Sequence, residues 1–185
     1  MSKRLTTQAH ELVAAALGAG EIVVDATVGN GYDTLFLAQT VGASGHVFGF
    51  DVQAPALACA RRRLRAADVQ EQVTLFCASH TEMCWLLPAD LHGRLGAVMF
   101  NLGYLPGSDH ARTTCAGTTV PALASAWSLL RPGGRLSIVT YRGHPGGGAE
   151  TAAVLGWMRE SVGRMQVIDA HPFADAAPLL VWCER

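Results

Sequence analysis

The chain has few of the features that would place it in a membrane, in a secretory compartment or along a nucleic acid. No apolar run approaches the ~18 residues that a membrane span needs, and the basic start has no cleavable signal pattern. The five cysteines include no CxxC pair, so the sequence indicates neither a zinc site nor a disulfide framework. A net charge of −1 argues against an extended, sequence-independent binding surface for nucleic acid. We therefore expect a cytoplasmic protein without a metal ion or a membrane-spanning segment.

Charged residues are also scarce, at 16%, whereas hydrophobic residues make up 50% of the chain. This composition is typical of a compact globular protein, and 185 residues suit a single domain over residues 1–185. No Ser-His-Asp ordering or nucleophile elbow is present. Four histidines lack metal-ligand spacing, and no chemistry is assigned to them: His10, His46, His92 and His171.

Apolar segments that suit strands alternate with segments that suit helices, which predicts an α/β fold around a parallel sheet. Strands are expected at residues 22–26, 46–51, 73–77, 97–101 and 135–140. Helices are expected at residues 6–17, 33–41, 55–67, 81–87, 120–130 and 149–162, with a helix stop and turn at 131–134.

Two further apolar segments, 165–170 and 179–183, are separated by only eight residues. That gap is too short for a helical crossover, so the two strands should be antiparallel. The sequence thus predicts a doubly wound, seven-stranded, mostly parallel sheet with a reversed last strand.

The stretch VVDATVGNGYDT, residues 23–34, predicts a ligand site at the carboxyl end of the first strand. Glycines such as Gly29 and Gly31 let the backbone approach a ligand, and the following helix offers unpaired N–H groups. Asp51 follows Asp25 by 26 residues, at the tip of the second strand, where ribose hydroxyls would be held.

The residues at the start of the helix expected at 33–41 distinguish between two ligands, S-adenosylmethionine and NAD. A dinucleotide site usually reads GxGxxG, but Thr34 stands at the third glycine and the acidic Asp33 precedes it. A carboxylate repels phosphate and accepts hydrogen bonds from an ammonium group, which favours S-adenosylmethionine over NAD. A turn without any ligand is the remaining alternative.

The chain resembles a family of small rRNA methylases in five segments: DATVGNGYDTLFLA, GHVFGFDVQ, NLGYLPGSD, LRPGG and YRGHPGG. That family includes bacterial tRNA 5-(aminomethyl)-2-thiouridine methyltransferases, and the resemblance covers residues 9–184. It implies a Rossmann-like class I methyltransferase fold, S-adenosylmethionine as cofactor, and methylation of a primary amine on the wobble uridine of tRNA. Tyr32 departs from the family pattern, which commonly has histidine at this position.

The cofactor would contact residues at four strand ends. The methionine end is assigned to Thr27, Asn30, Asp33 and Thr34, and the ribose to Asp51 and Val52. The adenine end would lie near Ser79 and His80, where His80 could instead cap the next helix or reach the acceptor. The full set of expected cofactor residues is Asp25, Thr27, Gly29, Asn30, Gly31, Asp33, Thr34, Asp51, Val52, Ser79, His80, Asn101 and Leu102.

The acceptor is expected at the tip of the fourth strand, in Asn101-Leu102-Gly103-Tyr104. This segment resembles loops with which amino-methyltransferases hold an acceptor nitrogen. Asn101 would accept an amine N–H, although a strand-end cap is the alternative. Tyr104 would stack on a base, or else pack in the pocket wall.

Two loops are expected to handle RNA, with the tRNA anticodon stem-loop as partner. After the fifth strand, Arg142 is a candidate phosphate contact and His144 a candidate proton acceptor. Asp109, His110 and Arg112 would form a polar lid after the fourth strand, with an ordinary surface loop as the alternative. A cluster of arginines lies in the helix expected at 55–67 and is either a solvated helix face or a surface that binds RNA: Arg61, Arg62, Arg63 and Arg65.

Other functions stay open from sequence alone. A methyltransferase could act on rRNA or on a small molecule, and an inactive RNA-binding protein is a further reading. The oligomeric state is also open, with a homodimer among the options.

Overall fold

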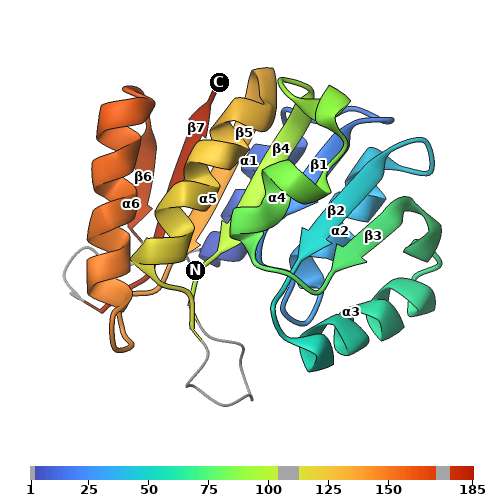
Figure 1. Ribbon diagram of the computed structural model, residues 1–185, viewed down its shortest axis with the longest axis horizontal. Coiled ribbons are helices and arrows are strands. Elements are labelled where there is room, and N and C mark those ends of the chain that lie inside the picture. Colours follow the sequence, from blue (N-terminus) through green and yellow to red (C-terminus); the bar gives the residue numbers. More distant parts are fainter. Residues whose placement is uncertain (1–2, 104–112, 170–175) are drawn as a thin grey trace.

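Seven strands form one sheet in the order β3-β2-β1-β4-β5-β7-β6 (Figure 1). The computed structural model describes residues 3–103, 113–169 and 176–185. The strands are β1 (Ile22–Asp25), β2 (His46–Phe50), β3 (Val73–Phe76), β4 (Leu95–Asn101), β5 (Leu130–Thr140), β6 (Gln166–Asp169) and β7 (Leu179–Glu184). Strands β1 to β5 pair in parallel, and β7 is antiparallel to both β5 and β6. The prediction of a mostly parallel sheet with a reversed last strand is confirmed.

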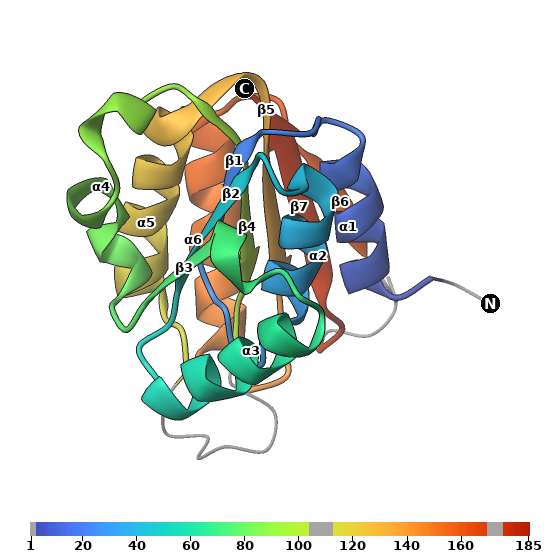
Figure 2. The ribbon, with the colours of Figure 1, turned by 90° about the vertical axis from the view of Figure 1, so that its right-hand side faces the viewer.

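Helices cover both faces of the sheet (Figures 1 and 2). They are α1 (Leu5–Ala14), α2 (Tyr32–Val41), α3 (Ala54–Ala66), α4 (Met83–Leu86), α5 (Ala116–Leu129) and α6 (Gly147–Ser161), with short 3-10 turns η1 (Gln70–Gln72), η2 (His80–Glu82) and η3 (Ala89–Leu91). Helices α4, α5 and α6 lie on one face, and α1 and α2 lie on the other. Helix α3 lies along the edge of the sheet to which β2 and β3 point. None of the helices described is long and apolar enough to cross a membrane.

The core has two layers because side chains alternate along the central strands. On β4, Val98 and Phe100 pack in the layer under α5, whereas Ala97 and Met99 pack in the layer that includes α1 and α2. Nearly all of β4 is buried, which is typical of a central parallel strand covered on both faces. This strand therefore carries Asn101, its last residue, to a defined place at the edge of the core.

Two expected boundaries are wrong, and the others differ by no more than about three residues. Helix α5 begins at Ala116, because Thr119 within its weak first turn is held by the buried Glu150. Residues 131–134 belong to β5 instead of forming a helix stop and turn. There the Gly133 N–H donates to the Arg185 carbonyl and the Gly134 carbonyl accepts from the Arg185 N–H, so Arg185 pairs with an irregular stretch of the strand.

Candidate active site

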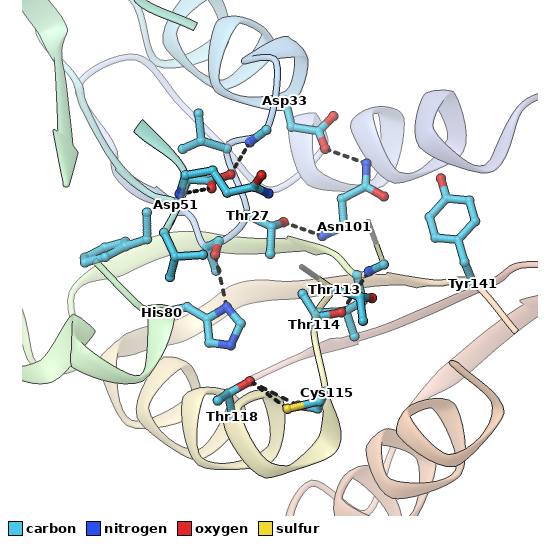
Figure 3. Close-up of a pocket in the computed structure, with 18 of the residues that line it drawn as sticks. Thr27, Asp33, Asp51, His80, Asn101, Thr113, Thr114, Cys115, Thr118 and Tyr141 are labelled. Atoms are coloured by element: carbon cyan, nitrogen blue, oxygen red, sulfur yellow. Dashed lines mark hydrogen bonds between the residues drawn. The ribbon is translucent and has the colours of Figure 1, made fainter. Parts of the chain in front are cut away.

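A cavity of about 790 Å³ opens at the carboxyl ends of the parallel strands (Figure 3). This volume is in the range of small-molecule sites. Its walls bring together most of the residues that the sequence singled out: Thr27, Gly29, Asn30, Asp33, Asp51, Val52, Ser79, His80, Asn101, Leu102 and His144. Tyr104, Asp109, His110 and Arg112 lie outside the described residues. Asp25, Gly31, Thr34 and Arg142 do not line the cavity.

The β1–α2 loop owes its shape to glycine. Gly29 and Gly31 both have positive φ, at 51° and 79°. A Cβ at Gly31 would lie 2.7 Å from the Cβ of Ala60 in α3, so the loop and the helix touch there. Gly31 therefore packs the loop against α3, and its expected contact with the cofactor stays a prediction.

Asp51 ties this loop to the end of β2. One carboxylate oxygen accepts the Gly29 N–H at 2.8 Å, and the other accepts the Gln53 N–H at 2.8 Å. Each oxygen keeps a further lone pair, because a carboxylate offers about four acceptor positions. Asp51 thus faces the cavity already oriented, with acceptor capacity left for two hydroxyl groups.

Asp25 lies behind the loop and supports it from inside the protein. Its carboxylate accepts the Thr27 N–H at 3.1 Å and the Thr34 hydroxyl at 2.6 Å. Burial, followed by the nearby Asp33 carboxylate, raises the pKa of Asp25 to about 7. Asp25 and Thr34 bond each other instead of lining the cavity, so both expected cofactor contacts are corrected to loop support.

Asn101 is held at two points at the end of β4. Its backbone N–H donates to the Thr27 hydroxyl at 2.7 Å, and its side-chain amide donates to Asp33 Oδ2 at 3.1 Å. With the amide nitrogen turned to Asp33, the side-chain oxygen lies on the side of Tyr141 (Figure 3). Asn101 therefore presents a carbonyl oxygen as an acceptor within the cavity.

His10 completes this arrangement from α1, although the sequence assigned it no chemistry. Its Nε2 lies 2.6 Å from Asp33 Oδ1, and its ring stacks on Phe36 at 3.9 Å with an interplanar angle of 2°. His10, Asp33 and Asn101 thus form a hydrogen-bonded chain from a partly exposed ring to the cavity.

Tyr141, the residue after β5, is a second residue that the sequence did not single out. Its ring lines the cavity opposite Asn101 (Figure 3). Burial, and then the charge of Asp33, raises the pKa of its hydroxyl. The position was recoverable in principle, because a side chain just past a parallel strand points to the shared edge.

Ser79 and His80 have different roles: Ser79 caps a helix, and His80 lies in the cavity wall. Ser79 caps η2: its hydroxyl accepts the Thr81 N–H, and its own N–H donates to Glu82. His80 is buried, with Nδ1 3.3 Å from the Ala26 carbonyl and its ring edge-on to Phe100. Burial lowers the pKa of His80, so a neutral imidazole forms part of the cavity wall.

Of the two candidate RNA-handling residues in the loop after β5, one lines the cavity and the other does not. His144 lines the cavity, as expected. Arg142 instead donates from Nε to the Ala177 carbonyl at 2.6 Å and pairs with Asp169 at 3.2 Å, near the β6–β7 connection. Arg142 therefore joins β5 to this connection, and its expected phosphate contact stays a prediction.

A buried carboxylate fixes the exit from β4. Glu150 of α6 is 2% exposed and accepts the hydroxyls of Thr114 at 2.8 Å and Thr119 at 2.6 Å. Thr114 in turn exchanges two hydrogen bonds with Gly103: its hydroxyl accepts the Gly103 N–H, and its N–H donates to the Gly103 carbonyl. Residues 103 and 114 are thereby clamped together beside the cavity.

The donor set suits S-adenosylmethionine better than a phosphate-bearing nucleotide. Asp33 and Asp51 line the cavity, and no lysine or arginine is among the lining residues that the structure describes. Phosphate would meet carboxylates without a cation, whereas a sulfonium and an ammonium would meet favourable charge. Asp51 suits ribose hydroxyls, and Phe50, Val52 and Ala78 supply apolar wall beside it.

Comparison with protein families identifies the family of this chain. The model of the family described as "Putative rRNA methylase" matches residues 47–182. A tRNA (mnm(5)s(2)U34)-methyltransferase of Arabidopsis thaliana chloroplasts is 38% identical over 160 residues, which cover 82% of this chain and 58% of that protein. The chain thus spans little more than half the length of this relative.

Solved structures also align over the full chain. A "putative rRNA-methylase" from Clostridium thermocellum is 37% identical with a TM-score of 0.92, covering 100% of this chain and 98% of that one. A methyltransferase from Streptococcus mutans, solved in complex with SAH, is 32% identical with a TM-score of 0.84, covering 100% and 99%.

Proposed function

Because this chain belongs to the family described as "Putative rRNA methylase", we propose that it methylates the primary amine of 5-aminomethyl(-2-thio)uridine at the tRNA wobble position. The cofactor prediction is confirmed, since the Streptococcus mutans structure holds SAH, the product form of S-adenosylmethionine. The amine substrate is inferred from the name of the Arabidopsis relative and from the acceptor side of the cavity.

The orientation of Asn101 carries this proposal. The bond from its amide nitrogen to Asp33 leaves the side-chain oxygen to accept one N–H of an incoming amine. An amine held in this way directs its lone pair away from Asn101 and towards the methyl donor. A hydroxyl group would use its single hydrogen in the bond to Asn101. A primary amine donates one hydrogen to Asn101 and keeps the other, and its one lone pair then points in a defined direction.

S-adenosylmethionine, when bound, supplies an electrophilic methyl group on a positively charged sulfur. Asp51 would hold the ribose of the cofactor, and the Gly29 backbone would lie close to the cofactor. The Asp33 carboxylate is bonded to Asn101, so its negative charge would favour a cationic group beside Asn101. The cavity would bring donor and acceptor together, which is the main need of an in-line methyl transfer.

The acceptor must lose a proton before its nitrogen attacks. An alkylamine has a reference pKa near ~10, so it enters mostly as ammonium. Asp33 and Asp51 attract this cation, and His144, which also lines the cavity, is our candidate to take the proton. His10 holds Asp33 at its second oxygen, which keeps Asp33 turned towards Asn101. We assign His10 a positioning role.

The test is nucleoside mass spectrometry of bulk tRNA from a deletion strain. We expect the unmethylated aminomethyl nucleoside to accumulate and the methylated one to return with the wild-type gene. The Asn101→Ala gene should restore the protein but little of the methylated nucleoside. An unchanged tRNA profile in the deletion strain would refute the proposed substrate.

A further inference from the structure

The cations of the described chain differ in their partners. Five are paired with carboxylates: Lys3–Glu11, Arg94–Asp90, Arg131–Glu21, Arg135–Glu184 and Arg142–Asp169. Arg185 instead donates to carbonyls near the end of α5. Arg61, Arg62 and Arg65 are exposed and have no carboxylate within 4.0 Å among the described residues.

Arg61, Arg62 and Arg65 lie on one helix, whereas three other exposed arginines without a carboxylate partner, Arg4, Arg159 and Arg164, lie elsewhere in the described chain. The α3 sequence APALACARRRLRA holds four arginines and no acidic residue. Arg61 and Arg65 are four residues apart and share one side of the helix, while Ala56, Leu57 and Leu64 form its buried side. The exposed side of α3 is therefore strongly positive in a chain whose net charge is −1.

Helix α3 is also fixed to the mouth of the cavity. It follows directly on Asp51, Val52 and Gln53, all of which line the cavity. Its fourth arginine, Arg63, donates to the Asn30 carbonyl at 2.9 Å and lies 3.5 Å from the ring centre of Tyr32. Tyr32 lines the cavity and is 63% exposed. Figures 1 and 2 show α3 running along the edge to which β2 and β3 point.

We propose that the exposed face of α3 binds the phosphate backbone of the RNA whose target nucleotide enters the cavity. The inference rests on the proposed function, because it takes RNA as the substrate. The described cavity lining contains no lysine or arginine, so it offers no cation for the backbone on either side of the target. The exposed arginines of α3, the helix that begins right after the lining residues Asp51 to Gln53, have the matching charge. The exposed Tyr32 ring, stacked with Arg63, gives a flat surface at the mouth where an unpaired base can stack.

The size of the effect follows from counterion release. Each phosphate contact makes the negative slope of log K against log salt steeper by about 1, so losing a contact makes it shallower. Each contact contributes a few-fold to affinity at about 0.15 M salt. Replacing Arg61 and Arg65 with glutamine should therefore weaken RNA binding about tenfold and reduce the slope by about 2. Glutamine keeps the helix propensity and removes only the charge.

The chain offers a matched control. Arg159 and Arg164 are also exposed and unpaired among the described residues, but they lie at the far end of α6 and beyond it. The experiment measures binding of a fluorescein-labelled anticodon stem-loop RNA by anisotropy over a range of salt. It compares the wild type, R61Q/R65Q and R159Q/R164Q, with the Kd for S-adenosylmethionine measured for each by calorimetry.

We expect R61Q/R65Q alone to lose affinity and salt slope, with an unchanged Kd for S-adenosylmethionine. Equal losses in both double variants would show a general charge effect and overturn the α3 surface. RNA binding by R61Q/R65Q equal to the wild type would also overturn it, leaving the proposed substrate intact. If wild-type protein binds S-adenosylmethionine but no RNA, the proposed function fails as well.

Discussion

Replacing Asp51 with alanine tests the assignment of the ribose site. In the structure Asp51 accepts the N–H groups of Gly29 and Gln53 at 2.8 Å each, and its remaining lone pairs face the cavity. Alanine removes all of these acceptors. Hydrogen bonds from two ribose hydroxyls to a charged group contribute about 1.5–3 kcal/mol each. Their loss should raise the Kd for S-adenosylmethionine by about 10²–10⁴-fold.

The loss of the two backbone bonds should cost less. Both N–H groups border the cavity, where water can replace the carboxylate, so the penalty for each is about 1 kcal/mol. Asp51→Asn should lie between wild type and Asp51→Ala, since an amide oxygen accepts but carries no charge. Asp90→Ala is the control, because that carboxylate is exposed in η3 and outside the cavity.

Isothermal titration calorimetry with S-adenosylmethionine and with SAH gives the readout, and circular dichroism verifies that each variant is folded. A folded Asp51→Ala protein with the Kd of the wild type would refute the ribose assignment. An equal loss in Asp90→Ala would show that the effect is not specific to the site.

Three further predictions concern the residues behind the cavity. Because burial raises the pKa of Asp25 to about 7 from an ordinary 3.8, the folded protein keeps a proton that the unfolded chain has released. The free energy of unfolding should therefore fall by up to about 4 kcal/mol as pH rises from about 4 to about 7, and urea titrations of Asp25→Asn should show a flatter profile. His10→Ala should lower kcat about tenfold or more with little change in the Kd for S-adenosylmethionine, and His10→Gln should recover part of kcat; equal kcat in both variants and wild type would exclude positioning. Glu150→Ala leaves the hydroxyls of Thr114 and Thr119 without their buried acceptor. Thermal unfolding should therefore show that the free energy of unfolding falls by about 3 kcal/mol or more, and by less in Glu150→Gln. An unchanged melting temperature in Glu150→Ala would contradict the role of Glu150 in holding residues 103 and 114 together.

Much of the site was predictable because parallel strands end at one edge. Asp51 and Asn101 each end or follow a strand, and the sheet order alone brings them to the same cavity. The sheet itself was predictable from alternating apolar segments, and its reversed last strand from the short gap before residue 179.

The residues that were missed act through contacts between distant parts of the chain. His10 lies 23 residues before Asp33 on a different helix, and no local pattern indicates that their side chains meet. Glu150 reaches Thr119 across 31 residues, and this bond stabilises a first turn of α5 that has low helix propensity. Asp25 and Thr34 were recognised as part of the ligand loop, but only the packing shows that they bond each other.

The most direct test of amine methylation uses the purified protein, S-adenosylmethionine and an anticodon stem-loop RNA that carries 5-aminomethyluridine. Nucleoside mass spectrometry before and after reaction identifies the product. We predict that the wild type converts this nucleoside to its N-methylated form, that Asn101→Ala binds S-adenosylmethionine but forms little product, and that the same RNA with plain uridine is not methylated. Absence of the N-methylated nucleoside with a protein that binds S-adenosylmethionine, or a methyl group at any other position of the RNA, would contradict this function.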